Sequence, residues 1–224
     1  MPDGGGWFIT IEGPDGAGKT TQAGALADHL RRRGLDVLLT REPGGTWLGE
    51  RVRELLLART GSTASTDPVT DAILFSAARR QLVTEVIRPA LARGTTVVCA
   101  RYADSTLAYQ GYGAGVPLDR LRALQAMATD GVQPDLTLLL DVPVETGLER
   151  KAPGDVTRFE AEFDLPFHRR VRDGFLALAA ASPDRFVVID ATRSSDVVAT
   201  AVNTAADRLI GAGEPKPDTA RTTR

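Results

Sequence analysis

Short apolar runs rich in β-branched residues alternate along the chain with longer segments in which apolar residues recur at helical spacing. The runs predict five strands, at residues 7–11, 37–40, 95–99, 136–141 and 186–190. The periodic segments predict helices at about residues 19–33, 47–58, 67–93, 118–129, 144–151 and 194–210, with a kink near Pro89, and a long helix within residues 159–181. Because strands and helices alternate and the strands are continuously apolar, we expect an α/β domain whose mostly parallel sheet is covered on both faces.

The chain of 224 residues is long enough for one domain with a buried core. We expect this domain at residues 7–210, between a flexible N-terminus (1–6) and a disordered tail (211–224) rich in Gly, Pro, Thr and Arg. No apolar run is long enough to span a membrane, and the first residues do not resemble a secretion signal. We therefore expect a cytoplasmic protein without a membrane partner, and the single cysteine, Cys99, in its core.

The charge balance narrows the class of ligand. Lys and Arg number 27 against 29 Asp and Glu, a net charge of −2, so the chain lacks the basic excess usual in nucleic-acid binders. We expect no nucleic-acid partner. In a parallel sheet, small ligands bind beyond the carboxyl ends of the strands, so functional side chains are expected just after residues 11, 40, 99, 141 and 190.

A phosphate-binding motif follows the first predicted strand. Residues 13–20 read G-P-D-G-A-G-K-T, which matches G-x-x-x-x-G-K-[ST] between a strand and a helix. Glycines let the backbone amides turn toward phosphate oxygens, Lys19 can reach the β- and γ-phosphates, and the Thr20 hydroxyl can join a Mg²⁺ shell. The segment predicts a nucleoside triphosphate site at Gly13, Pro14, Asp15, Gly16, Ala17, Gly18, Lys19, Thr20 and Thr21.

Two arginines just past strand ends suggest where a phosphate acceptor binds. Arg41 follows the second strand and Arg101 the third, and two guanidiniums there can clamp a monophosphate with paired hydrogen bonds. Phe75 and Arg79 lie four residues apart on one helix face, so one can stack on a flat base while the other donates to a base carbonyl. Taken singly, Phe75 could instead be a core residue and Arg79 a solvated surface residue.

Three more side chains suit a nucleotide. The Gln110 amide can both donate to and accept from a pyrimidine edge. Tyr109 can form a wall against the sugar that excludes a 2′-hydroxyl, although ordinary packing is the alternative. Asp15, inside the phosphate loop, can accept a hydrogen bond from a 3′-hydroxyl.

These motifs together resemble one family. The segments R-E-P-G-G-T at 41–46, L-F-S-A-A-R at 74–79, R-Y-A-D-S-T-L-A-Y-Q-G at 101–111 and P-D-L-T-L-L-L-D-V at 134–142 match thymidylate kinases in order and spacing. The resemblance covers about residues 7–210. It implies a P-loop NTPase-type three-layer α/β/α fold, nucleoside monophosphate kinase-like, with a five-stranded parallel sheet and a short lid.

The resemblance also implies an activity. Members of this family transfer the γ-phosphoryl group of ATP to dTMP with Mg²⁺, giving ADP and dTDP. They are homodimers packed through helices such as the one that carries Phe75. The family's substrate-binding positions fall here on Asp15, Arg41, Phe75, Arg79, Arg101, Ser105, Tyr109 and Gln110, and Thr20 is the metal ligand.

A charged segment at about residues 147–163 resembles the family's lid over ATP. Phosphoryl transfer needs cations where charge develops and needs water excluded. The phosphate loop has Asp15 and Gly16 but no arginine, which resembles the class with lid arginines. We therefore nominate Arg150 and Arg158 as catalytic together with Lys19 and Arg101, the alternative for each lid arginine being a solvated charge.

One position departs from the family pattern. The third strand ends in Ala100-Arg101-Tyr102, where the family usually has an aspartate before the arginine. A nearby acid, Glu12, Asp15 or Asp104, can substitute for it. The alternatives left open are a kinase for another, 5-modified deoxyuridine monophosphate and a nucleotide-binding homologue without turnover.

Overall fold

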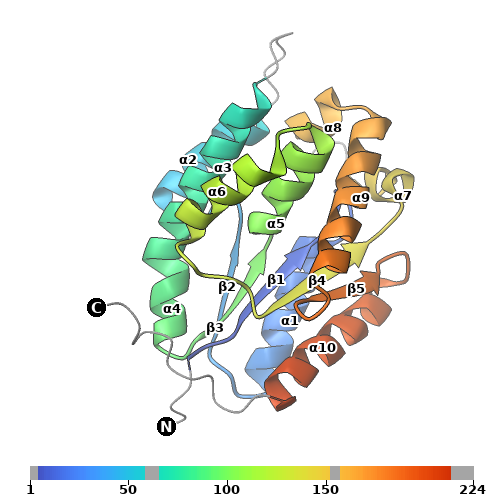
Figure 1. Ribbon diagram of the computed structural model, residues 1–224. Helices are drawn as coiled ribbons and strands as arrows, with labels where there is room; N and C mark the ends of the chain where they lie inside the picture. Colours follow the sequence, from blue (N-terminus) through green and yellow to red (C-terminus); the bar gives the residue numbers. More distant parts are fainter. Residues whose placement is uncertain (1–4, 59–65, 152–156, 213–224) are drawn as a thin grey trace.

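The computed structural model describes residues 5–58, 66–151 and 157–212. Five parallel strands form a central sheet in the order β2-β3-β1-β4-β5, and helices cover both of its faces (Figure 1). The expected α/β architecture is therefore confirmed. The expected flexible N-terminus and disordered tail fall largely outside the described residues. The strands are β1 (Phe8–Glu12), β2 (Val37–Arg41), β3 (Thr96–Ala100), β4 (Leu136–Asp141) and β5 (Phe186–Asp190).

The helices follow the predicted order, with some shifts at their ends. The last one continues through Ala212, two residues into the segment expected to be a tail. The segment 159–181 contains the expected long helix as α9, preceded by a short helix, α8. The helices outside the two regions described next are α1 (Lys19–Arg32), α2 (Trp47–Leu57), α6 (Leu118–Thr129), α7 (Val144–Glu149), α8 (Arg158–Glu162), α9 (Leu165–Ala181) and α10 (Ser195–Ala212).

The long helix predicted over 67–93 is interrupted just before its proline. It consists of α3 (Pro68–Leu82), a π-helical turn η1 (Val83–Ile87) and α4 (Arg88–Ala92). Pro89 has no backbone N–H, so the regular hydrogen-bond ladder cannot continue through it. The Asp67 side chain caps α3 by accepting from the amides of Val69 and Thr70, as its position before Pro68 predicts.

The segment after β3 was not predicted to be helical. It forms a short helix, α5 (Ala103–Thr106), followed by a π-helix, η2 (Leu107–Gly113). This segment packs against α9, and a side chain at Gly113 would meet Phe167 and Val171. Tertiary packing, more than a local helical pattern, holds the segment that carries Ser105, Tyr109 and Gln110.

The core lies on both sides of the sheet because successive strand residues face opposite ways. Ile9 and Ile11 of β1 point to the side covered by α1 and α10. Phe8 points to the other side, where Tyr102 meets it edge-on with ring centroids 5.0 Å apart. Cys99 is buried on this second side, as expected. Both faces of β1 are thus fixed, which makes it a rigid support for the loop that follows it.

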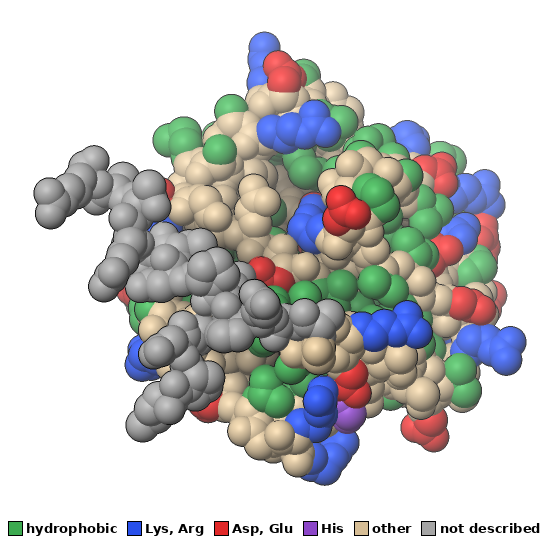
Figure 2. Space-filling view, turned by 60° about the horizontal axis from the view of Figure 1, so that its bottom comes forward, with side chains coloured by type: hydrophobic (Ala, Val, Ile, Leu, Met, Phe, Trp, Pro, Cys, Tyr) green, Lys and Arg blue, Asp and Glu red, His purple; other side chains and the backbone are tan. Residues whose placement is uncertain are grey.

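The surface carries mixed charge. On the face shown in Figure 2, basic and acidic side chains are interspersed, in keeping with the net charge of −2. Among the described residues, the helices are too short or too polar to cross a lipid bilayer.

Candidate active site

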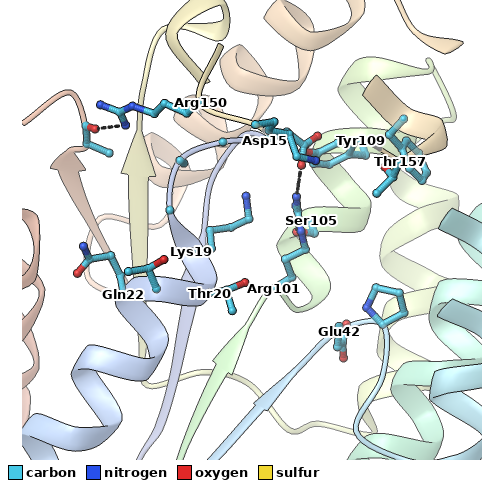
Figure 3. Close-up of a pocket in the computed structure, with 18 of the residues that line it drawn as sticks. Asp15, Lys19, Thr20, Gln22, Glu42, Arg101, Ser105, Tyr109, Arg150 and Thr157 are labelled. Atoms are coloured by element: carbon cyan, nitrogen blue, oxygen red, sulfur yellow. Dashed lines mark hydrogen bonds and ion pairs between the residues drawn. The ribbon is translucent and has the colours of Figure 1, made fainter. Parts of the chain in front are cut away.

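A cavity of about 990 Å³ opens at the carboxyl ends of β1 and β3 (Figure 3). The chain runs from β1 to β2 on one side of β1 and later passes from β3 to β4 on its other side, and ligands in folds of this kind bind where the strand order reverses. Of the residues singled out in the sequence, this cavity is lined by Asp15, Gly16, Ala17, Gly18, Lys19, Thr20, Thr21, Phe75, Arg79, Arg101, Ser105, Tyr109, Gln110 and Arg150.

The phosphate loop is shaped by glycines that no other residue could replace without strain. Gly13 has φ 144° and Gly16 has φ 74°, both disfavoured for a side-chain-bearing residue. A Cβ at Gly13 would lie 2.4 Å from the Leu140 carbonyl oxygen, and one at Gly16 only 1.7 Å from that of Gly147. The loop therefore packs backbone against backbone on β4 and α7.

Lys19 begins α1 and folds back over its own loop. Its ammonium donates to the carbonyl oxygens of Gly13 at 2.9 Å and Pro14 at 2.6 Å. Burial and the neighbouring Arg101 lower the pKa of Lys19 to about 7, against the opposing charges of Asp15 and Glu12. An anionic phosphate at this position would favour the charged form of Lys19.

Asp15, Arg101 and Tyr109 meet over the phosphate loop. Arg101 Nη2 lies 2.5 Å from Asp15 Oδ1, and the Tyr109 hydroxyl donates to Asp15 Oδ2 at 2.7 Å. Burial acts to raise the pKa of Asp15, but Arg101, Lys19 and Lys151 outweigh it and hold the pKa at about 2. Asp15 is therefore an acceptor of hydrogen bonds at any physiological pH.

Aromatic rings surround the opposite end of the cavity. Phe75 from α3 and Phe159 from α8 both line it, with ring centroids 6.1 Å apart, and Tyr109 meets Phe159 edge-on at 5.9 Å. Gln110 lines the cavity beside them and is buried. A flat base with a polar edge fits this corner. Sequence reasoning missed Phe159, although it follows a nominated lid arginine.

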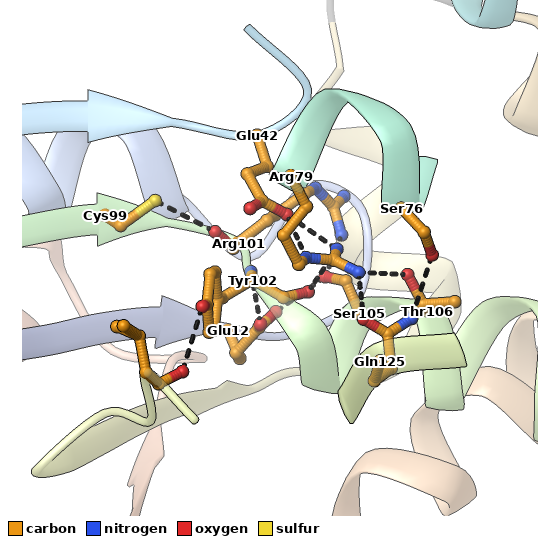
Figure 4. Close-up of polar contacts among 11 residues, drawn as sticks. Glu12, Glu42, Ser76, Arg79, Cys99, Arg101, Tyr102, Ser105, Thr106 and Gln125 are labelled. Carbon is orange, nitrogen blue, oxygen red and sulfur yellow. Dashed lines mark hydrogen bonds and ion pairs between the residues drawn. The ribbon is translucent and has the colours of Figure 1, made fainter. Parts of the chain in front are cut away.

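Arg79 differs from its expected role. Its guanidinium is 1% exposed and directs all five N–H groups at protein oxygens (Figure 4). Two of these five hydrogen bonds go to Glu42, at 2.6 and 2.8 Å, and the other three go to three different oxygens. The Glu42–Arg79 pair is therefore a buried ion pair beneath the cavity, and Arg79 has no donor left for a base in this conformation. The other acceptors are the Tyr102 carbonyl, the Thr106 hydroxyl and the Gln125 side chain.

The two arginines expected to hold a phosphate lie in different settings. Arg101 lines the cavity, whereas Arg41 is half-exposed outside its lining and pairs with Glu50 at 3.2 Å. Arg53 from α2 lines the cavity near them and donates to the Pro43 carbonyl at 3.1 Å. Burial lowers the pKa of Arg53, and Arg41 and Arg101 lower it further, so three cations converge here. Arg53 carries no motif that could have identified it; only its place on the helix after β2 pointed to this end of the sheet.

The nominated lid arginines are both engaged elsewhere. Arg158 is buried, pairs with Asp71 at 2.8 Å and lies outside the cavity lining. Arg150 lines the cavity but donates to the carbonyls of Ala191 and Thr192 after β5. Lys151, which we did not nominate, lines the cavity close enough to affect the pKa of both Asp15 and Lys19.

The donor set for a metal ion is sparse but suitable for one that arrives with phosphates. The Thr20 side chain is exposed to the cavity at the start of α1. In the described part of the chain, no three His, Cys, Asp or Glu side chains cluster as a metal site. Mg²⁺ keeps several waters and usually takes one or two protein oxygens plus substrate phosphates. The Thr20 hydroxyl fits that pattern.

Comparison with known proteins agrees with this geometry. The model of the thymidylate kinase family matches residues 11–202. A thymidylate kinase from Thermomicrobium roseum is 52% identical over 213 residues, which are 94% of this chain and 99% of that protein. One from Deinococcus radiodurans is 55% identical over 192 residues, 85% of this chain and 91% of that protein. The crystal structure of thymidylate kinase from Ehrlichia chaffeensis superposes with a TM-score of 0.71 at 36% identity, covering 92% of this chain and 99% of that one. The chain therefore belongs to the thymidylate kinase family.

Proposed function

We propose that this cavity transfers the γ-phosphoryl group of ATP to dTMP, giving ADP and dTDP. The observation that carries the proposal is that one continuous cavity joins the phosphate loop to an aromatic corner that the buried Gln110 also lines. A phosphate oxygen of the acceptor is already a nucleophile, so no general base is required. The protein's task is to align the two phosphates and neutralise the charge that develops between them.

The donor phosphates bind along the loop from Gly13 to Thr21. Its backbone amides and the start of α1 favour anions, and Lys19 leaves its own carbonyl partners to meet the β- and γ-phosphates. The Thr20 hydroxyl would hold a Mg²⁺ that arrives with the phosphates, and the ion would supply charge neutralisation when bound. The nucleobase of ATP fits the far end of the cavity, beside Arg150 and Ser195.

The acceptor lies with its base between the aromatic rings and its phosphate at Arg101. Phe75 stacks on the pyrimidine, Gln110 reads its edge, and Tyr109 faces the sugar. Asp15 accepts from the 3′-hydroxyl, and Ser105 lines the same wall. Arg53 joins Arg101 at the phosphate, and Arg41 reaches it by leaving Glu50. Arg79 supports this corner from below through its pair with Glu42.

The lid contributes two cations in this proposal. Lys151 lies near the phosphate loop and neutralises charge during transfer, and Arg150 holds the nucleotide side. The catalytic role expected for Arg158 requires that it leave Asp71, so in the described conformation we assign it to fixing α8 on α3. Phe159 then closes the acceptor corner from the lid side.

The oligomeric state and the cellular location complete the proposal. We propose a homodimer, because α2, α3 and α6 lie side by side and expose large apolar residues on their outer surface (Figure 1): Trp47, Leu55, Ile73 and Met127. We propose a cytoplasmic enzyme because both substrates are phosphorylated nucleotides made in that compartment.

The proposal is tested by ADP release with Mg·ATP and a panel of dTMP, dUMP, dCMP and 5-hydroxymethyl-dUMP. We expect the fastest turnover with dTMP, lost in Lys19→Ala. An Ala100→Asp variant run in parallel is expected to keep the same preference. Faster turnover with a 5-modified acceptor, or a silent wild type that Ala100→Asp restores, would contradict the proposal.

A further inference from the structure

The backbone bends in an unfavourable way where β3 delivers Arg101 to the cavity. Arg101 has φ 69°, and among the described residues only Asp130 shares a positive φ without being glycine. A side chain disfavours this left-handed conformation, which persists only where the surroundings fix it. The bend directs the guanidinium back over the phosphate loop toward Asp15.

Neighbouring groups from β1 and β3 hold this bend. The Arg101 amide donates to the Ile11 carbonyl at 2.9 Å, and Cys99 Sγ contacts the Arg101 carbonyl oxygen at 3.1 Å. The next amide, of Tyr102, donates to Glu12 Oε1 at 2.7 Å (Figure 4). Glu12 is fully buried at the end of β1. A carboxylate on a rigid strand thus fixes the backbone immediately after the strained residue.

The second oxygen of Glu12 reaches the Arg101 side chain through a hydroxyl. Ser105 Oγ donates to Glu12 Oε2 at 2.6 Å, and Arg101 Nη1 donates to Ser105 Oγ at 3.2 Å. Since a hydroxyl has one proton and gives it to Glu12, its lone pairs are left to accept from Arg101. Glu12 therefore sets both the backbone and one side-chain contact of Arg101.

The other two acids at this place have different partners. Both oxygens of Asp104 accept from Arg185, at 2.7 and 3.0 Å. Asp15 lies on the cavity side of Arg101, where a substrate binds. Glu12 is thus the carboxylate behind Arg101, on the side away from substrate.

We propose that Glu12 is a positioning residue for phosphoryl transfer, which through the Tyr102 amide and the Ser105 hydroxyl holds Arg101 in its reactive orientation. This inference rests on the proposed function of the cavity. It assigns no contact between Glu12 and either nucleotide. It accounts for a fully buried acid next to the phosphate loop that the transfer reaction itself does not use.

The charge state of Glu12 follows from what surrounds it. Burial and the nearby Asp104 together raise its pKa to about 7, against the opposing effects of Ser105, Arg101 and the Tyr102 amide. The other charged or titratable groups that face it are Lys19, Arg79 and Cys99. A protonated Glu12 would donate to Ser105 Oγ and compete with Arg101 for its lone pairs. Turnover should therefore increase as the pH rises through about 7.

The test compares steady-state kinetics of Glu12→Gln and wild type across pH 5.5–9. We expect kcat/KM for dTMP to fall about 10- to 100-fold, the scale of loss when a reacting group is slightly misplaced, while KM for ATP changes little. The rise in turnover near pH 7 should be absent from the variant. A purely structural role for Glu12 would lower the thermal midpoint but leave the pH profile of the folded enzyme unchanged.

Asp104→Asn is the matched control, because it neutralises an adjacent buried carboxylate that does not contact Arg101. We expect it to retain KM for dTMP and to shift the rise in turnover to lower pH. Wild-type kcat, KM and pH profile in Glu12→Gln would overturn the inference.

Ser105→Ala provides a second test if Glu12→Gln does not fold. It removes the hydroxyl that connects Glu12 to the Arg101 side chain and leaves the buried charges unchanged. We expect Ser105→Ala to lower kcat/KM for dTMP to a similar extent. Where Glu12→Gln does fold, the double variant Glu12→Gln/Ser105→Ala should be no less active than the poorer single variant, because both substitutions act through one contact. Multiplicative losses would overturn the inference. If the wild type turns over no dTMP, the proposed function fails, and calorimetric dTMP binding by the same variants still tests whether Glu12 positions Arg101.

Discussion

At the scale of single residues, the site is made of charged groups whose present partners are protein atoms. Lys19 contacts two carbonyls of its own loop, and Arg101 contacts Asp15 and Tyr109. Each of these contacts occupies a donor that a phosphate or sugar would use. In the proposed function, substrate binding exchanges partners in a prearranged set of donors, which reduces the ordering required on binding.

Lys19 should take up a proton when ATP binds. Its pKa of about 7 in the free enzyme leaves it mostly neutral at pH 8, and the triphosphate favours the charged form. We expect calorimetry at pH 8, in buffers of different ionisation enthalpy, to show uptake approaching one proton. Lys19→Met should show none. Binding to the wild type without proton uptake would contradict the lowered pKa.

Arg79→Lys should lower the free energy of unfolding more than it weakens dTMP binding. Lysine cannot reproduce the five donors, so Glu42 and its neighbours lose partners in a buried site, and we expect a loss of about 3–5 kcal/mol in the free energy of unfolding. Arg88→Lys, at a half-exposed pair with Asp130, should cost less than about 1 kcal/mol. Urea unfolding measures both. A stable Arg79→Lys protein that no longer binds dTMP would show instead that Arg79 reads the base.

At the scale of elements, the phosphate loop and the start of the lid are in direct backbone contact. A Cβ at Gly147 on α7 would lie 2.3 Å from the Asp15 carbonyl oxygen. Any movement of α7 is thus transmitted to the loop that binds phosphate.

Gly147→Ala should therefore reduce activity by displacing the phosphate loop. We expect kcat/KM for ATP to fall by about 10²-fold, since small misplacements of reacting groups have effects of that order. Gly24→Ala is the control: nothing lies within 4 Å of its added Cβ on α1, and alanine should stabilise that helix by about 0.5–1 kcal/mol. Steady-state kinetics and thermal unfolding measure the two effects. Equal activity of both variants would argue against the coupling.

At the scale of the whole molecule, α2, α3 and α6 expose large apolar side chains that a second copy of the chain would bury. Met127 is 75% exposed and Ile73 51% exposed, although both are large apolar side chains. The acceptor corner lies directly behind α3, so pairing of two copies on this surface would hold Phe75 in place.

Replacing both residues, Ile73→Glu with Met127→Glu, should convert the proposed dimer to a monomer. Charges placed in an apolar interface lose hydration without gaining partners. Sedimentation velocity measures the mass directly. Val188→Glu, at an exposed position on the edge strand β5, should leave the dimer intact. A monomeric wild type, or a double variant that stays dimeric, would exclude this surface as the interface.

The amino-acid sequence by itself determined the order of strands and helices, the phosphate loop and the side chains gathered beyond β1 and β3. Those features follow from local patterns: the spacing of apolar residues, the glycines of the phosphate-binding motif, and the loops that follow strand ends. The π-helical segment η2 escaped this reasoning because its packing on α9, far along the chain, holds it.

Only the tertiary structure decided which acid each arginine meets. Arg158 pairs with Asp71 and Arg79 with Glu42, contacts between residues 87 and 37 positions apart in the chain. A guanidinium binds any carboxylate with similar geometry, so its partner depends on which elements the fold brings together. For the same reason Arg53 and Lys151 could be recognised only after folding. The sequence named Glu12 as one of three acids that could replace the missing aspartate, and burial and its contacts then distinguished it from the other two.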